Sequence, residues 1–370
     1  MSRRLAPRLL AASLLVAAAS SLAGACKRDD ATGAGGGTSS SSTSTGFEEP
    51  ESPVCGDEVH QALSDAPLLY FVLDASGSMS AQAGGGKSRF LRVREGARDV
   101  TSRLGSLVRV GAAVYPLDAT EDPPCGSGDE VLEPRAGGST AATKLYTATD
   151  VATFGGTPTA AALASVRTRL ASVPGQRVVL LATDGGPNCN FDTSCTADQC
   201  IPNIEGSCPE GVANCCVDPG TPGNCLDRAA TLKAVSELAA DGITVYVIGI
   251  PGSELYGTLL DQMAIIGGGA QQDAATRYYR IDDLGSLGDI FAEIGAALVS
   301  CTFDLADPPE GVGLTNVYFD DSVVLQDATN GWVWVDGDTI ELVGAACEEL
   351  RSGRVSRVQI VSGCPTAVPL

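Results

Sequence analysis

Apolar runs of seven or eight residues alternate with amphipathic stretches between about residues 66 and 300, and this alternation constrains the fold most. In the run RVVLLATD (177–184) the residues from Val178 to Ala182 are all apolar, which is typical of a strand buried on both faces of a parallel sheet. Strands that alternate with helices predict an α/β fold with a doubly wound, mostly parallel six-stranded sheet flanked by helices. The expected strands are LLYFVLD (68–74), VRVGAAVYP (108–116), the edge strand EVLEP (130–134), RVVLLATD, ITVYVIGI (243–250) and RYYRI (277–281).

Helices are expected between these strands. A stripe from Phe90 to Leu104 predicts the first helix, and Thr157-Pro158 opens another, because Thr is a good N-cap and Pro suits the first helical position. Three more helices are expected at 226–240, 254–266 and 285–300. The last 70 residues instead contain short alternating strands with Asn-Gly and Asp-Gly turns, which predict a small β module at 302–370.

The first residues have the pattern of an export signal. A basic segment, a short apolar core and the small residues AGAC predict a signal peptide at 1–25. Cys26 resembles the lipidated cysteine of bacterial lipoproteins, with simple secretion as the alternative. A Gly/Ser/Thr-rich linker (26–54) would then separate the anchor from the main domain at 55–301.

Charge and histidine content exclude several classes of function. The formal net charge of −21 argues against nucleic acid and against direct adhesion to anionic lipid, so a membrane would be met only through a lipid anchor. A single histidine, His60, excludes most zinc enzymes and histidine-based catalysis.

The cysteine content indicates an oxidising compartment and hence an exported, cell-envelope protein. Of thirteen cysteines, seven lie in a segment at 188–225, for which disulfides are favoured over zinc. Seven is odd, and Cys125 follows a strand that ends at the same sheet edge, so we expect Cys125 to bond to this insert. We further predict Cys55–Cys301 and Cys347–Cys364. The candidates are Cys55, Cys125, Cys189, Cys195, Cys200, Cys208, Cys215, Cys216, Cys225, Cys301, Cys347 and Cys364.

Oxygen-bearing side chains collect at the carboxyl ends of two predicted strands. Asp74, Ser76 and Ser78 are spaced two apart after the first strand, which places them on one side of an extended chain. Asp184 ends RVVLLATD, and Thr157 lies in the Gly-rich loop GGTPTA. Two acids and three hydroxyls suit a hard cation, Mg²⁺ in particular, with Mn²⁺ or Ca²⁺ as alternatives.

These residues resemble a known family. DASGS (74–78), the threonine of GGTPT and the aspartate of ATDGG match, in order, the metal-ion-dependent adhesion site of von Willebrand factor A domains, over roughly 66–300. The resemblance implies that Ser76, Ser78 and Thr157 contact the metal, while Asp74 and Asp184 act through bound water. It also implies a protein partner that offers an Asp or Glu carboxylate to the metal.

Three functions follow from these features. The preferred one is a cation-dependent adhesion module of an envelope lipoprotein, displayed at the outer membrane. The alternative is a structural or assembly protein with a vestigial metal site, whose contacts are made by the insert and the β module. An enzyme comes third and no catalytic residue is proposed, because the sequence offers no convincing general base, and Ala81 breaks the phosphate-loop pattern around Lys87.

Overall fold

The computed structural model describes residues 58–60, 66–117, 125–218, 220–309 and 311–369. The predicted signal peptide, Cys26, the linker and Cys55 lie outside these residues, so their roles stay predictions. Among the helices of the described residues, none is both long and apolar enough to cross a membrane.

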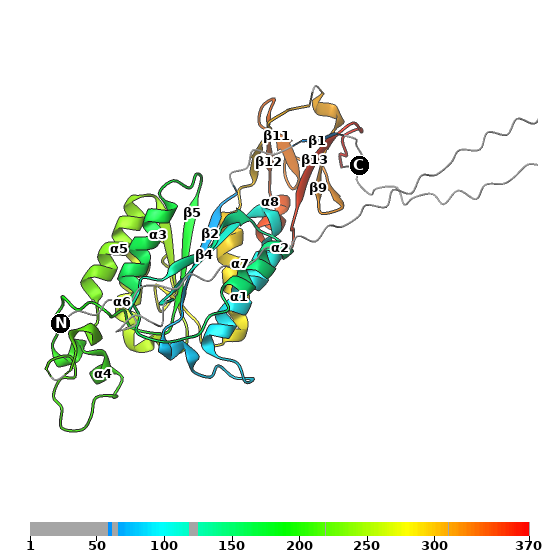
Figure 1. Cartoon of the computed structure of the whole chain (residues 1–370). Coiled ribbons are helices and arrows are strands. Elements are labelled where there is room, and N and C mark those ends of the chain that lie inside the picture. The colour runs from blue at the N-terminus through cyan, green and yellow to red at the C-terminus, as the bar shows by residue number, and fades with distance from the viewer. Residues whose placement is uncertain (1–57, 61–65, 118–124, 219, 310, 370) are drawn as a thin grey trace, which may run out of the picture. The chain divides into compact units, whose positions relative to one another are not determined.

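The main sheet of the described chain has six strands, and helices flank it (Figure 1). Its strands are β2 (Leu68–Asp74), β3 (Arg109–Tyr115), β4 (Asp129–Ala136), β5 (Arg177–Thr183), β6 (Ile243–Gly249) and β7 (Tyr279–Arg280). They lie in the order β4-β3-β2-β5-β6-β7, and all neighbours are parallel except β3 and β4. The predicted fold class, a doubly wound and mostly parallel sheet, is therefore confirmed.

Helices cover both faces of this sheet (Figure 1). On one face pack α1 (Arg89–Leu104), α2 (Ser139–Ala148) and α7 (Leu287–Leu298). On the other face pack α3 (Thr159–Leu170), α5 (Arg228–Ala240) and α6 (Gly257–Ile266). The short helix α4 (Ile201–Ile204) lies within the cysteine-rich insert.

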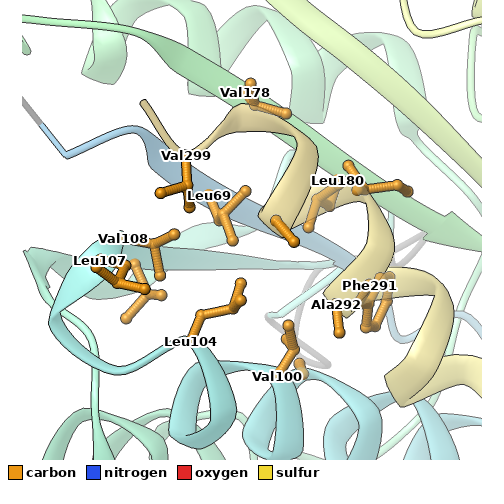
Figure 2. Packing of buried hydrophobic residues seen from close by; sticks show 14 of the residues in the cluster. Leu69, Val100, Leu104, Leu107, Val108, Val178, Leu180, Phe291, Ala292 and Val299 are labelled. Carbon is orange, nitrogen blue, oxygen red and sulfur yellow. The ribbon is translucent and has the colours of Figure 1, made fainter. Parts of the chain in front are cut away.

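The central strand β2 is buried along its whole length, and its alternate side chains serve the two faces. Leu69, Phe71 and Leu73 pack with α1 and α7, whereas Leu68, Tyr70 and Val72 pack with α3 and α5. Figure 2 shows the first of these clusters, in which Leu69 of β2 lies between Leu104 of α1 and Val299, just after α7. The Phe71 and Phe291 rings meet edge to face, with centroids 5.5 Å apart. This packing holds β2 between the two helical layers.

Two elements differ from the expectation. The stretch after β4 forms α2, which the sequence analysis did not predict because its Ala and Thr residues give only a weak apolar stripe. Arg94 of α1 holds the C-terminal end of α2, because its guanidinium donates a hydrogen bond to the Tyr146 carbonyl (2.7 Å) and forms an ion pair with Asp150. The expected strand 277–281 is reduced to the two residues of β7.

The C-terminal region forms two small antiparallel sheets, as the alternating pattern predicted. Their strands are β1 (Glu58–His60), β8 (Thr302–Asp304), β9 (Thr315–Phe319), β10 (Ser322–Val324), β11 (Trp332–Trp334), β12 (Thr339–Leu342) and β13 (Val358–Ser362). The sheet orders are β1-β13-β9-β10 and β11-β12-β8, and α8 (Ala345–Arg351) follows β12. Strand β1 precedes the central sheet in sequence but pairs with β13 near the end of the chain.

The disulfides correct two predicted pairings. Cys301 is bonded to Cys347, so both Cys55–Cys301 and Cys347–Cys364 are wrong. The physical reason is that β8, which follows Cys301, pairs with β12, and β12 leads directly into α8, where Cys347 lies. Cys364 is also disulfide-bonded. Cys125 is bonded to Cys189 of the insert, in agreement with the expectation for Cys125. The insert is closed further by Cys195–Cys225, Cys200–Cys216 and Cys208–Cys215.

Candidate metal centre

Strand pairing brings two acidic residues to the same edge of the sheet. β2 and β5 are parallel and in register up to Leu73 and Ala182, so Asp74 arrives beside Thr183, and Asp184 follows it. The Thr183 hydroxyl donates a hydrogen bond to Oδ2 of Asp74 at 2.6 Å. The role of Thr183 is not visible in the sequence pattern, because it depends on the register between two strands.

The turn after β2 directs the two serines toward Asp184. Oδ1 of Asp74 accepts a hydrogen bond from the Ser76 amide at 2.8 Å, and a short 3₁₀ turn follows at Gly77–Ser80. The Ser76 and Ser78 hydroxyl oxygens lie 3.1 Å apart, and the Ser78 hydroxyl donates to Oδ1 of Asp184 at 2.7 Å. Asp74, Ser76, Ser78 and Asp184 therefore form one connected group.

The loop before α3 adds Thr157. This loop is fixed to the serine turn by two backbone hydrogen bonds, from Gly77 to the Gly155 carbonyl (3.1 Å) and from Phe154 to the Ala75 carbonyl (2.9 Å). The Thr157 amide donates to Oδ1 of Asn188, a residue of the insert that the sequence analysis did not assign to the site. The structure thus brings all five predicted site residues to one edge of the sheet.

Gly185 leaves open space between the hydroxyl groups. A Cβ added at this position would lie 3.3 Å from the Thr157 hydroxyl oxygen and 3.7 Å from that of Ser78. A side chain here would therefore fill the region where oxygens from three segments converge. Glycine keeps that region free for a small ligand.

Burial raises the cost of charge at the site. The Asp74 side chain is fully buried, and Asp184 is nearly so, whereas Ser78 is exposed and opens the group to solvent. Loss of hydration, and secondarily the neighbouring Asp184 carboxylate, raise the pKa of Asp74 to about 7. Burial also raises the pKa of Asp184, although hydrogen bonds from Ser78 and Arg89 oppose that shift.

Arg89, the first residue of α1, also reaches the site. Its Nη1 lies 2.5 Å from Oδ2 of Asp184. Nothing in the sequence pattern pointed to this contact, which joins residues 95 positions apart. The nearby Lys87 points elsewhere, with its Nζ 2.6 Å from Oε1 of Glu95.

The donor set fits a hard divalent cation. The Ser78 and Thr157 hydroxyls lie beside Gly185, and Ser76, Asp74 and Asp184 are joined to Ser78 directly or through one neighbour. These side chains offer only oxygen donors, which suit Mg²⁺, Mn²⁺ or Ca²⁺. Among the described residues, the three cysteines that lie close enough to share a metal are Cys195, Cys216 and Cys225. All three are in disulfides, so they provide no thiolate ligand.

The cysteine-rich insert lies directly beside the candidate site. The Cys125–Cys189 bond, Gly155, Gly156 and Phe191 line a cavity of about 570 Å³. A neighbouring cavity of about 480 Å³ continues along α3 and α5 and shares the disulfide, Asn188 and Phe191. The Phe191 side chain remains 47% exposed between them. The insert therefore forms part of the surface around the candidate metal centre.

Comparisons with known proteins agree with this fold. The family model described as von Willebrand factor type A domain matches residues 69–293. No curated protein matches the sequence. The fold resembles the pilus adhesin SpaC of Lactobacillus rhamnosus GG at 16% identity and a TM-score of 0.48, covering 81% of this chain and 39% of SpaC.

Two further solved structures cover less of this chain. The von Willebrand domain of the type V pilus tip protein Mfa5 of Porphyromonas gingivalis is 15% identical, with a TM-score of 0.41 and coverage of 63% of this chain and 95% of that one. Manganese-loaded TRAP of Plasmodium vivax is 16% identical, with a TM-score of 0.38, and the match covers 60% of this chain and 71% of TRAP. Because all three TM-scores lie below 0.5, these likenesses carry no argument about what this chain does.

Proposed function

The chain belongs to the von Willebrand factor type A domain family, and from this we propose that it is a divalent-cation-dependent protein-binding module of an exported cell-envelope lipoprotein. The observation that supports the proposal is that Asp74, Ser76, Ser78, Thr157 and Asp184 meet at one edge of the sheet, where the Ser78 and Thr157 hydroxyls face Gly185.

The hydroxyl groups of Ser76, Ser78 and Thr157 would hold the cation. Asp74 and Asp184 would act through bound water, because both oxygens of each carboxylate already accept hydrogen bonds from the protein. Mg²⁺ is the preferred ion, since it retains water ligands readily, and Mn²⁺ or Ca²⁺ are alternatives. When bound, the cation supplies an open position for an anionic oxygen.

The partner would be a protein that presents an Asp or Glu carboxylate. An acidic chain with net charge −21 repels an acidic partner at long range, so the attraction must be local, at the cation. Lipidation at Cys26 would keep the module at the outer membrane, and the disulfides of the described residues suit such an oxidising location.

A structural or assembly role with a vestigial metal site is the second candidate. The observation that favours it is the ion pair between Arg89 and Asp184, because a guanidinium can replace the cation as the partner of a buried acid. In that case the insert and the C-terminal sheets would make the contacts.

A pull-down from cell envelopes separates the two candidates. The protein is used as bait with Mg²⁺ or with a chelator, alongside Asp74→Ala and, as a control, Glu133→Gln, an exposed acid of β4. Cation-dependent binding predicts that chelation and Asp74→Ala remove the same partners, while Glu133→Gln retains them. Identical capture under all conditions would instead support the assembly role.

A further inference from the structure

Arg89 contacts the proposed metal centre but is not one of its oxygen donors. Its guanidinium is partly exposed, with 22% of the side chain accessible, whereas its partner Asp184 has a fully buried side chain. A fixed positive charge beside a cation site opposes cation binding. The inference below rests on the proposed function and concerns the control of that same site.

The position of Arg89 is well determined by its surroundings. Its amide donates to the Ala81 carbonyl at 2.9 Å, and Ser88 caps α1 by accepting a hydrogen bond from the Leu91 amide. The guanidinium packs on Gly252, which has a φ of +113°, and a Cβ there would approach Nη1 to 2.8 Å. Helix capping and a glycine thus hold the guanidinium against Asp184.

Arg89 changes the net charge of the group that it forms with Asp74 and Asp184. Asp74 and Asp184 together with Arg89 carry one net negative charge when both acids are ionised. A divalent cation therefore leaves the loaded group with a net positive charge, whereas without Arg89 it would be neutral. A positive, partly exposed group attracts an anionic side chain more strongly than it attracts water or a neutral amide.

We propose that Arg89 is a specificity-determining residue, which weakens cation binding to the unliganded site and strengthens the binding of a carboxylate to the loaded one. Cation and carboxylate bind cooperatively because they attract each other directly, and each increases the affinity for the other by the same factor; Arg89 sets how tightly each binds to this pair of sites. The chemical class of partner that this arrangement selects is an acidic peptide segment.

The test uses Mn²⁺ alone as the probe, titrated by calorimetry into the exported, disulfide-bonded protein. Wild type is compared with Arg89→Gln, and with Arg92→Gln as a matched control, since Arg92 lies on the same helix but pairs with Glu95. We expect Arg89→Gln to bind Mn²⁺ about tenfold more tightly, the order expected when a unit charge leaves a partly exposed site, and Arg92→Gln to match wild type. Equal affinities for the two variants would overturn the proposal.

Two further measurements exclude a merely structural role. Arg89→Lys keeps the charge and should restore the wild-type Mn²⁺ affinity, whereas a lysine variant that behaves like glutamine would refute a charge effect. Replacing chloride by acetate at constant ionic strength should tighten Mn²⁺ binding to wild type and Arg92→Gln more than to Arg89→Gln. An equal effect of acetate on all three would refute the proposed strengthening of carboxylate binding by Arg89.

The outcomes distinguish this proposal from the proposed function. If wild type binds no Mn²⁺ but Arg89→Gln does, then Arg89 controls the site as inferred, and the cation-dependent function of the natural chain is wrong. If neither binds Mn²⁺, both fail. If wild type binds and Arg89→Gln loses binding, the proposed function stands, and Arg89 supports the site instead of opposing the cation.

Discussion

Replacing Asp74 by asparagine should stabilise the cation-free protein while abolishing its response to a cation. Asp74 is fully buried, and loss of hydration raises its pKa to about 7, against about 3.9 in an unfolded chain. Asparagine has nearly the same shape and keeps an oxygen for the Ser76 amide, but carries no charge. The substitution therefore removes the electrostatic cost and leaves the fold of the turn in place.

The sign of the effect follows from proton binding. Between about pH 4 and pH 7 the folded protein holds a proton on Asp74 that the unfolded chain has released, so the free energy of unfolding falls as pH rises. By about pH 8, the difference between these pKa values corresponds to a loss of about 4 kcal/mol in the free energy of unfolding of wild type. Asp74→Asn avoids this loss, but it gives up roughly 1 kcal/mol because the amide no longer accepts a hydrogen bond from Thr183. The free energy of unfolding of Asp74→Asn should therefore exceed that of wild type by about 3 kcal/mol at about pH 8.

Urea denaturation monitored by tryptophan fluorescence, without reductant, measures this difference. In chelator the variant should be more stable than wild type at about pH 8 and similar at about pH 4. In Mg²⁺ at about one hundred times its Kd, wild type should gain about 2.7 kcal/mol and the variant almost nothing. Glu133→Gln is the control for loss of one acid. A cation-free variant less stable than wild type at the higher pH would refute the electrostatic reasoning, and an equal gain from Mg²⁺ would refute the role of Asp74.

Three other changes test the site and its support. Gly185→Ala places a methyl group 3.3 Å from the Thr157 hydroxyl oxygen and should weaken Mg²⁺ binding at least tenfold by calorimetry, whereas Gly337→Ala, which meets no neighbour, should not. Replacing both Cys125 and Cys189 by serine removes a disulfide that joins residues 64 positions apart. The free energy of unfolding in urea should fall by up to about 4 kcal/mol. An unchanged urea midpoint would show that other contacts hold the insert. Phe71→Ala removes a buried ring that packs on Phe291 and should cost about 3–5 kcal/mol, and a smaller loss would mean that α7 closes the cavity.

Local patterns in the sequence were sufficient for the central sheet. β5 is apolar from Val178 to Ala182 because both its faces are covered, and that pattern identifies it without any knowledge of its neighbours. The helix α2 was missed because its buried residues are mostly alanines, which give a weak apolar stripe, and its position depends on contacts with α1. The pairing of Cys301 was mispredicted since it depends on the order of strands in a small sheet, which short alternating strands do not specify.

The candidate site also contains residues that the sequence pattern identifies and residues that it does not. Asp74, Ser76 and Ser78 were accessible to sequence reasoning because their spacing is local, and Asp184 because it ends a readily identified strand. Arg89 and Asn188 were not, since each contacts the site through a side chain whose direction is fixed by packing. Burying two carboxylates beside each other is unfavourable for folding. The ion pair with Arg89 offsets part of that cost at Asp184, and Gly185 leaves room beside the Ser78 and Thr157 hydroxyls, where a bound cation would offset the rest. The Asp74→Asn comparison in chelator and in Mg²⁺ measures that unfavourable contribution and its compensation separately.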